Sequence, residues 1–303
     1  MLYRLGIDIG GTGAKLGVVD EEFNIVERAT VPTAGETADG IINAIIVCAK
    51  GLMAKYPVTE AGIGSAGRVV RETGVVQRAG HLPFSNEPVA GRISEGIGLK
   101  AAIDNDANCA LIGEKAAGAC KGKRDAIILT IGTGIGGAVM INGRIYRGFN
   151  NRAGELGHFS MDLNGEVCEC GLRGCFELQA SATALTALTA EYIEKEPESL
   201  LAKIAKEQGI DGKTSFAALA SGCPTAKKLL CEYGRRLAMG IDSLAYIFQP
   251  EVIVLSGGVS KAGQPLLDLL PQWRVSENPV VISRLHGDAG IIGASLAGSD
   301  YTL

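Results

Sequence analysis

Short apolar runs separated by glycine turns open the chain. Residues Leu2 to Ile9 form an apolar run with one acid, Asp8, near its end, which predicts a strand. The turn Gly10–Gly13 leads into a second predicted strand at Ala14 to Asp20, and a third follows at Asn24 to Val31. Consecutive strands joined by short turns predict an antiparallel meander.

Helix and strand patterns then alternate toward the middle of the chain. Good helix formers precede Pro57, which favours a helix that ends before that proline. Apolar runs bounded by polar turn residues favour strands between the helices. The pattern predicts helices at Thr37–Lys55, Val89–Glu95 and Ala107–Ala119, and strands at Glu60–Gly64 and Lys100–Asp104.

The pattern restarts near residue 125. A predicted strand at Ala126–Ile131 is followed by the glycine turn Gly132–Gly137, a strand at Ala138–Ile141 and a hairpin signal at Asn142-Gly143. Two halves that begin alike indicate an internal duplication, and mixed strands and helices indicate an α/β protein with two lobes and a central cleft. Further helices are predicted at Ala182–Lys195, Glu198–Glu207, Thr225–Phe248 and Gly290–Gly298, with a strand at Val252–Leu255.

Composition narrows the class of protein. The 303 residues, of which 47% are hydrophobic and 20% charged, suit two globular lobes. The net charge of −4 gives no basic surface for nucleic acid or anionic membrane, so we expect neither as a partner. The longest uncharged run, Ala126 to Asn142, is short for a membrane span and rich in glycine, and the N-terminus does not resemble a signal peptide. A cytoplasmic protein is expected.

Two glycine-rich segments match the dinucleotide-binding pattern G-x-G-x-x-G. They are Gly62 to Gly67 and Gly132 to Gly137. A dinucleotide fold needs this pattern to run from a strand directly into a helix, whose N-terminus holds the pyrophosphate. Both segments are followed by strand-like residues, so a dinucleotide site is not expected.

Strand–turn–strand glycine loops can still bind phosphate through converging backbone N–H groups. The loops Gly10–Gly13 and Gly132–Gly137, one at the start of each half, could hold a triphosphate from opposite sides of a cleft. Asp8 precedes the first loop and is placed to hold Mg²⁺, and Thr12 can donate to a phosphate oxygen. Each turn alone is also compatible with an ordinary hairpin.

Asp104-Asn105-Asp106 lies between a predicted strand and a predicted helix. One interpretation is a helix N-cap, because Asp and Asn favour that position. The other makes Asp106 a carboxylate that accepts the proton of a substrate hydroxyl, the one base that phosphoryl transfer requires.

A cluster of soft ligands lies beyond the second glycine loop. Nine residues separate His158 from Cys168, one separates Cys168 from Cys170, and four separate Cys170 from Cys175. These four side chains suffice for a closed tetrahedral zinc site. The flanking acids, including Glu155 and Glu177, exceed what the metal needs and indicate a second ligand.

These four motifs and a fifth, Val254–Ser260, resemble in type and in order along the chain those of the ROK family, whose members include bacterial sugar kinases and sugar-responsive repressors. The family belongs to the actin/hexokinase-like ATPases, with duplicated ribonuclease H-like domains. Its zinc-loop pattern C-x-C-G-x-x-G-C-x-E-x-x-x-S is matched throughout, after the E-x-x-H of Glu155 and His158. The matching segments are Asp8–Thr12 and Ile131–Gly137 for phosphate, Asn105–Asn108 for catalysis, Cys168–Ser181 for the zinc loop and Val254–Ser260 for adenosine.

The resemblance implies an ATP-dependent sugar kinase that uses Mg²⁺ and a structural Zn²⁺. It makes Asp106 the catalytic base and Asp8 the magnesium ligand. The implied zinc ligands are His158, Cys168, Cys170 and Cys175. Sugar contacts are implied for Gly67, Asn105, Glu155, His158 and Glu177, and nucleotide contacts for Asp8, Gly10, Gly11, Thr12, Thr133, Gly134, Gly257 and Gly258.

The resemblance is weaker in the sugar-binding lobe. Gly67-Arg68-Val69-Val70 stands where the family often has Gly-Pro-Val-Asp, and His81-Leu82-Pro83-Phe84-Ser85 replaces Asn-Leu-Pro-Gly-Trp. Either the sequence of a surface loop has diverged without functional effect, or the sugar preference has changed. The expected substrate is glucose or a close analogue phosphorylated at the 6-OH, with N-acetylmannosamine, N-acetylglucosamine and β-glucosides as alternatives.

A sugar-sensing repressor is the alternative from another class. Such members resemble this chain after an N-terminal winged helix-turn-helix, whereas the first phosphate strand here begins by Leu2. We therefore expect an enzyme, and Asp8, Asp106 and both glycine loops disfavour a catalytically silent binding protein. The resemblance suggests a homodimer or homotetramer. The expected lobes are 1–118 with a C-terminal helix in 290–303, and 119–289 with the zinc loop.

Overall fold

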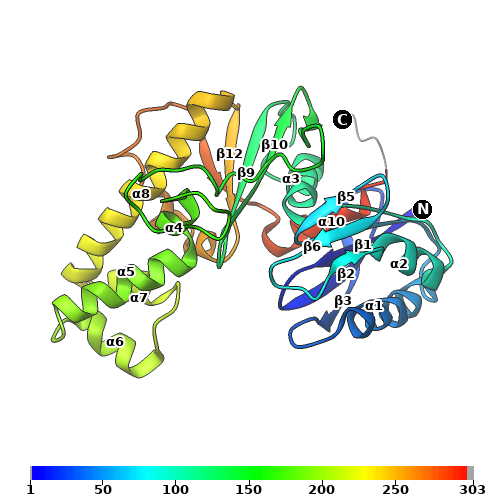
Figure 1. Ribbon diagram of the computed structural model, residues 1–303, viewed down its shortest axis with the longest axis horizontal. Helices are drawn as coiled ribbons and strands as arrows, with labels where there is room; N and C mark the ends of the chain where they lie inside the picture. The colour runs from blue at the N-terminus through cyan, green and yellow to red at the C-terminus, as the bar shows by residue number, and fades with distance from the viewer. Residues whose placement is uncertain (1, 299–303) are drawn as a thin grey trace. The chain divides into compact units, whose positions relative to one another are not determined.

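The computed structural model describes residues 2–298 and has the α/β class expected from the sequence (Figure 1). The chain divides into two compact units. The first contains the described residues up to Asp125, Ala138–Gly154 and those from Arg284 onward; the second contains Ala126–Gly137 and Glu155–Ser283. The lobe boundaries given above stay a prediction, and their residues 299–303 lie outside the described part of the chain.

A five-stranded sheet forms the centre of the first unit, in the order β3-β2-β1-β4-β8. The first three strands pair antiparallel, which confirms the predicted meander, whereas β1, β4 and β8 pair in parallel. The strands are β1 (Tyr3–Ile9), β2 (Gly13–Val19), β3 (Ile25–Pro32), β4 (Val58–Ser65) and β8 (Ala101–Asn105).

Alternation along β1 gives the sheet two different faces. Leu5, Ile7 and Ile9 are fully buried in an apolar core that also contains residues of α1 (Ala38–Met53) and α2 (Val89–Ile97). The opposite face carries glycines and meets α10 (Ala289–Ser295). A methyl group built on Gly6 would lie 2.0 Å from the carbonyl oxygen of Ile291, and one on Gly62 would lie 1.9 Å from that of Ala294.

The glycines of Gly62 to Gly67 therefore have a packing role. The segment continues from β4 into β5 rather than into a helix, and Gly132–Gly137 likewise continues in β10, so the rejection of a dinucleotide fold is confirmed. A small antiparallel sheet follows that the sequence pattern did not predict. It contains β5 (Arg68–Val70), β6 (Val75–Arg78) and β7 (Ser85–Glu87).

The second five-stranded sheet has the order β11-β10-β9-β12-β13. Strand β12 lies between β9 and β13 and is parallel to both. The predicted hairpin at Asn142-Gly143 is confirmed, because β10 and β11 pair antiparallel across it. The strands are β9 (Ala126–Ile131), β10 (Ile135–Ile141), β11 (Arg144–Ile145), β12 (Val252–Ser256) and β13 (Val280–Ile282).

Helices dominate the rest of the second unit, and polar side chains mark where two of them begin. Ser181 accepts a hydrogen bond from the N–H of Ala184 at the start of α5, and Ser199 caps α6 in the same way. The helices are α4 (Phe176–Ala180), α5 (Ala182–Lys195), α6 (Leu200–Gln208), α7 (Thr214–Ala220), α8 (Pro224–Phe248) and α9 (Gln264–Leu267), with a 3₁₀ turn η1 (Val259–Ala262). The first unit also holds α3 (Asp106–Ala117) and a 3₁₀ turn η2 (His286–Asp288).

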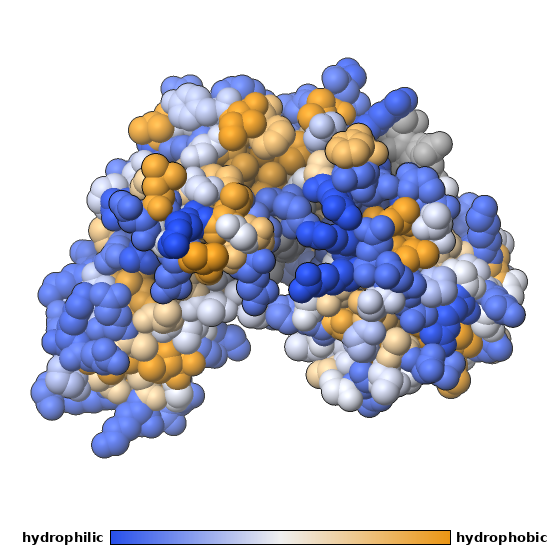
Figure 2. Space-filling model, viewed as in Figure 1, coloured by the Kyte–Doolittle hydropathy of each residue, from blue (hydrophilic) through white to orange (hydrophobic). Residues whose placement is uncertain are grey.

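Hydrophobic residues on the surface form small, separate groups among hydrophilic ones in the view of Figure 2. Within residues 2–298, none of the helices combines the length and apolarity needed to cross a bilayer.

The close approach between β4 and α10 yields a stability test. Gly62→Ala should lower the free energy of unfolding by about 3 kcal/mol, because backbone atoms of α10 occupy the space of the new methyl group. Gly51→Ala is the matched control: it lies in α1 with open space around it and should stabilise by about 0.5–1 kcal/mol. Urea unfolding measures both, and equal effects would contradict the packing argument.

Candidate functional site

The predicted site residues of the first unit follow the carboxyl ends of three adjacent parallel strands. Ile9 of β1 is in register with Ser65 of β4, and Ser65 with Asn105 of β8. The first phosphate loop, Gly67 and Asp106 therefore start from one edge of the sheet. This edge is where open α/β sheets bind their ligands.

The first glycine loop is a tight turn closed by its own backbone. The N–H of Gly10 donates to the carbonyl of Gly13 at 3.1 Å, and the hydroxyl of Thr33 donates to the carbonyl of Gly10 at 2.7 Å. Gly11 has no room for a side chain, because a methyl group there would lie 2.7 Å from Cβ of His81. Thr12 is exposed at the tip.

Asp8 is a partly buried acid at the end of β1. Desolvation raises its pKa to about 7, with the charge of Asp106 as the second cause and Lys15 opposing both. Its carboxylate also lies against α10, since a methyl group on Gly290 would come within 2.6 Å of Oδ2. A carboxyl group whose pKa is raised by burial and by a second acid nearby is suited to a divalent cation.

Asn105 occupies the N-cap of α3, so the capping interpretation of this segment is confirmed. Its Oδ1 accepts from the N–H groups of Ala107 at 2.9 Å and Asn108 at 3.3 Å. Its Nδ2 donates to the carbonyl of Gly67 at 3.2 Å. Asp106 is the first residue of the helix and accepts from the N–H of Ala107 at 2.9 Å. Capping and a role for Asp106 in proton transfer are compatible, because different side chains perform them.

An ion pair that no sequence motif predicts supports this segment. Arg147 donates from Nε at 2.9 Å and from Nη2 at 2.5 Å to Oδ2 of Asp104, which is only 3% exposed. The other oxygen of Asp104 accepts from the side chain of Asn108 and the N–H of Asn105, both at 2.8 Å. A buried carboxylate with four hydrogen bonds fixes the strand end that precedes Asp106.

In the second unit, the predicted nucleotide residues also follow parallel strands. The glycine loop of Thr133 and Gly134 leaves β9, and Gly257 and Gly258 leave its parallel neighbour β12. Gly257 has φ +87°, and a methyl group there would lie 2.5 Å from the carbonyl of Ile131, so glycine is required.

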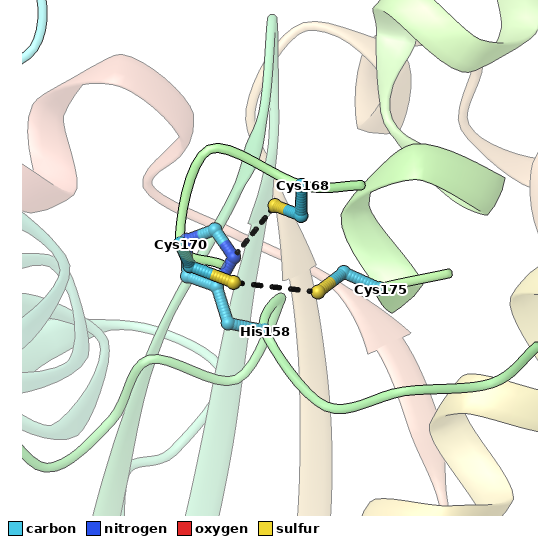
Figure 3. A group of neighbouring side chains, drawn as sticks. All are labelled: His158, Cys168, Cys170 and Cys175. Atoms are coloured by element: carbon cyan, nitrogen blue, oxygen red, sulfur yellow. Dashed lines mark hydrogen bonds between the residues drawn. The ribbon is translucent and has the colours of Figure 1, made fainter. Parts of the chain in front are cut away.

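The four predicted zinc ligands come together in the second unit (Figure 3). Their ligand atoms all lie within 4.8 Å of one another. Sγ of Cys168 is 3.5 Å from Nδ1 of His158, and Sγ of Cys170 is 3.5 Å from Sγ of Cys175. Ligands at about 2.1–2.3 Å from a tetrahedral zinc lie roughly 3.5–3.8 Å apart, so this set fits zinc.

The two acids that flank the cluster differ in their surroundings. Glu155 is exposed, and its carbonyl accepts from the N–H of His158 at 3.1 Å. Glu177 lies in α4, and its Oε2 accepts from the N–H of Ile135 at 2.8 Å, within the second glycine loop. The sugar contacts predicted for both acids stay predictions.

The chain is similar to known proteins along nearly its whole length. The ROK family profile matches residues 4–298. A glucokinase of Streptomyces coelicolor is 35% identical, over 97% of this chain and 97% of its own. The crystal structure of a ROK family glucokinase from Streptomyces griseus, in complex with glucose and AMPPNP, is 34% identical and superposes with a TM-score of 0.85, covering 97% of this chain and 98% of that one. A putative xylose repressor of a Caldicellulosiruptor species is 28% identical over 88% of this chain and 68% of its own.

Because the pKa of Asp8 is raised, replacing this residue should increase the free energy of unfolding by an amount that depends on pH. In the range from its ordinary pKa of 3.8 to about 7, the folded protein keeps a proton that the unfolded chain loses. The folded state therefore loses relative stability as the pH rises through this range. Asp8→Asn should stabilise the protein by up to about 4 kcal/mol at pH 8, and by less than about 1 kcal/mol near pH 4. Thermal unfolding without added magnesium measures the difference, which must vary with pH if the ionisation is its cause.

The geometry of the cluster predicts one zinc ion per chain. His158→Ala should reduce the zinc content to less than about half an ion and raise the sugar KM, because Nδ1 lies beside Sγ of Cys168 and the proposed dual role gives the other ring nitrogen a sugar hydroxyl. Cys231→Ala, a partly buried cysteine outside the cluster, is the control and should keep its zinc. The dual role of His158 is rejected if His158→Ala leaves both the zinc content and the sugar KM unchanged.

Proposed function

Because this chain belongs to the ROK family, we propose that it is an ATP-dependent sugar kinase that phosphorylates a hexose, glucose or a close analogue, at the 6-OH. The observation that carries the proposal is the common origin of the predicted base and phosphate loop at one edge of parallel strands. Similarity to glucokinases along nearly the whole chain supports it.

Asp106 serves as the general base in this proposal. Its carboxylate accepts the proton of the attacking hydroxyl as the oxygen bonds to the γ-phosphorus and the bond to the β-phosphate oxygen breaks. Asp104, held by Arg147, keeps the end of β8 in place, and the Asn105 cap fixes the first turn of α3. Asp106 therefore has a defined position from which to approach the hydroxyl.

Asp8 would hold Mg²⁺, and Thr12 with the N–H groups of the glycine loops would bind the phosphates. The ion supplies positive charge that neutralises the phosphates and favours the ionised form of Asp8. Burial leaves that carboxyl with a pKa of about 7, so the cation restores a charge that the surroundings disfavour.

The exposed Glu155, with His158 and Glu177, would receive the sugar hydroxyls on a loop shaped by zinc. Sugar preference would be adjusted by the segments that depart from the family pattern, near Arg68 and His81. N-acetylmannosamine, N-acetylglucosamine and β-glucosides remain the alternative substrates.

A coupled ADP-release assay over a panel of sugars tests the proposal. Glucose should give the highest kcat/KM, and Asp106→Asn should lower kcat by about 10²–10⁴-fold with sugar binding largely kept, because only proton transfer is lost. Asp268→Asn, an exposed acid after α9, is the control and should retain wild-type turnover.

Near-normal turnover in Asp106→Asn would reject the base assignment. ADP release with none of the sugars, together with a sugar-dependent gel shift, would favour a regulator instead.

A further inference from the structure

The second glycine loop is held by the segment that follows the zinc ligands. Its carbonyls accept hydrogen bonds from the start of α5: the N–H of Ala182 donates to Gly132 at 2.8 Å, and the hydroxyl of Thr183 donates to Thr133 at 2.7 Å. On the other side of the loop, the N–H of Ile135 donates to Oε2 of Glu177 at 2.8 Å. Three hydrogen bonds therefore join the loop to one short stretch of chain, Glu177 to Thr183.

Glu177 packs closely against the loop through both its side chain and its backbone. A methyl group on Gly134 would lie 2.2 Å from Oε2 of Glu177, so the carboxylate fills the space beside that glycine. The backbone N–H of Glu177 donates to the carbonyl of Gly157 at 2.9 Å. Gly157 in turn lies against the loop, because a methyl group there would be 2.3 Å from the carbonyl of Ile135.

This arrangement sets the orientation of the peptide N–H groups of the loop. A hydrogen bond that a peptide N–H donates to a carboxylate is charge-assisted and stronger than a neutral one. Because it fixes the N–H of Ile135 on Glu177, it orients the preceding peptide groups of the loop. A carboxylate has two oxygens, so a bond from Oε2 to the loop leaves the other oxygen able to accept from a sugar hydroxyl.

We propose that Glu177 is a positioning residue for the nucleotide as well as a contact for the sugar. Its bond to Ile135 holds residues 132–137 in the form that binds phosphate, so the loop is ordered before ATP arrives. The inference rests on the proposed function, because it deepens the role of the same site. The zinc loop would then also help to position the phosphate loop. Its ligands His158 and Cys175 lie next to Gly157 and two residues before Glu177, the two residues that contact the phosphate loop.

Binding of AMPPNP to the zinc-loaded protein without sugar separates this role from sugar contact. Glu177→Ala should weaken AMPPNP binding at least about tenfold, because a charged hydrogen bond is lost. Glu177→Gln keeps an acceptor oxygen and should stay within about threefold of wild type. Glu155→Ala removes the other predicted sugar acid, whose exposed carboxylate makes no hydrogen bond to residues 132–137 among the described residues, and should leave AMPPNP affinity unchanged. Isothermal titration calorimetry measures all four proteins.

A purely sugar-binding Glu177 would leave AMPPNP affinity in Glu177→Ala within twofold of wild type, which overturns the proposal. Equal weakening in Glu155→Ala would overturn it as well. Should Glu177→Ala fail to fold, Glu177→Asp carries the test: its shorter side chain keeps the charge but withdraws from Ile135, and unaltered affinity counts against the proposal.

Hydrogen exchange of a peptide covering 132–137 tests the contact independently of ATP. Exchange at Ile135 should be faster in Glu177→Ala and Glu177→Asp than in wild type and Glu177→Gln, and equal rates would reject the positioning role. A wild-type protein that does not bind AMPPNP would reject the proposed kinase function, while this exchange measurement still decides the role of Glu177.

Discussion

The chemistry of the first unit depends on the register of three parallel strands. Ile9, Ser65 and Asn105 lie side by side, so the turns that follow them leave from one edge. A shift of one residue would turn each strand's buried side chains to the opposite face. Gly6 and Gly62 enforce the observed register, because only glycines can face the backbone of α10 at these distances. Core packing and site geometry therefore share one constraint.

Three acids lie at the same edge of the sheet, and their surroundings differ. Asp104 is neutralised by Arg147 and saturated with hydrogen bonds, so it contributes order. Asp8 lies close to Asp106 and keeps a raised pKa, so it contributes a site for positive charge at some expense of stability. An electrostatic cost of this kind is expected at a functional site, where a protein gives up some stability for function.

Local patterns predicted the parts of the structure that depend on neighbouring residues. The meander, the helices around Asp106 and near the C-terminus, and the Cys/His cluster all follow from short spacings. The small sheet at 68–87 was missed because its strands are only three or four residues long and carry exposed polar positions. The bonds Arg147–Asp104 and Glu177–Ile135 join residues more than 40 positions apart, and each partner looks like an ordinary loop or helix residue by itself.

The interleaving of the two units has a consequence for how the protein is made. The face of β1 and β4 that carries Gly6 and Gly62 is covered by α10, whose first residue is Ala289. A ribosome synthesises β1 and β4 long before that helix emerges, and Arg147, the partner of Asp104, also comes after the strand it supports. The N-terminal sheet must therefore wait, partly uncovered, while the second unit is built. A fragment that ends before Ala289 would leave the glycine-bearing face of β1 and β4 without the helix that covers it.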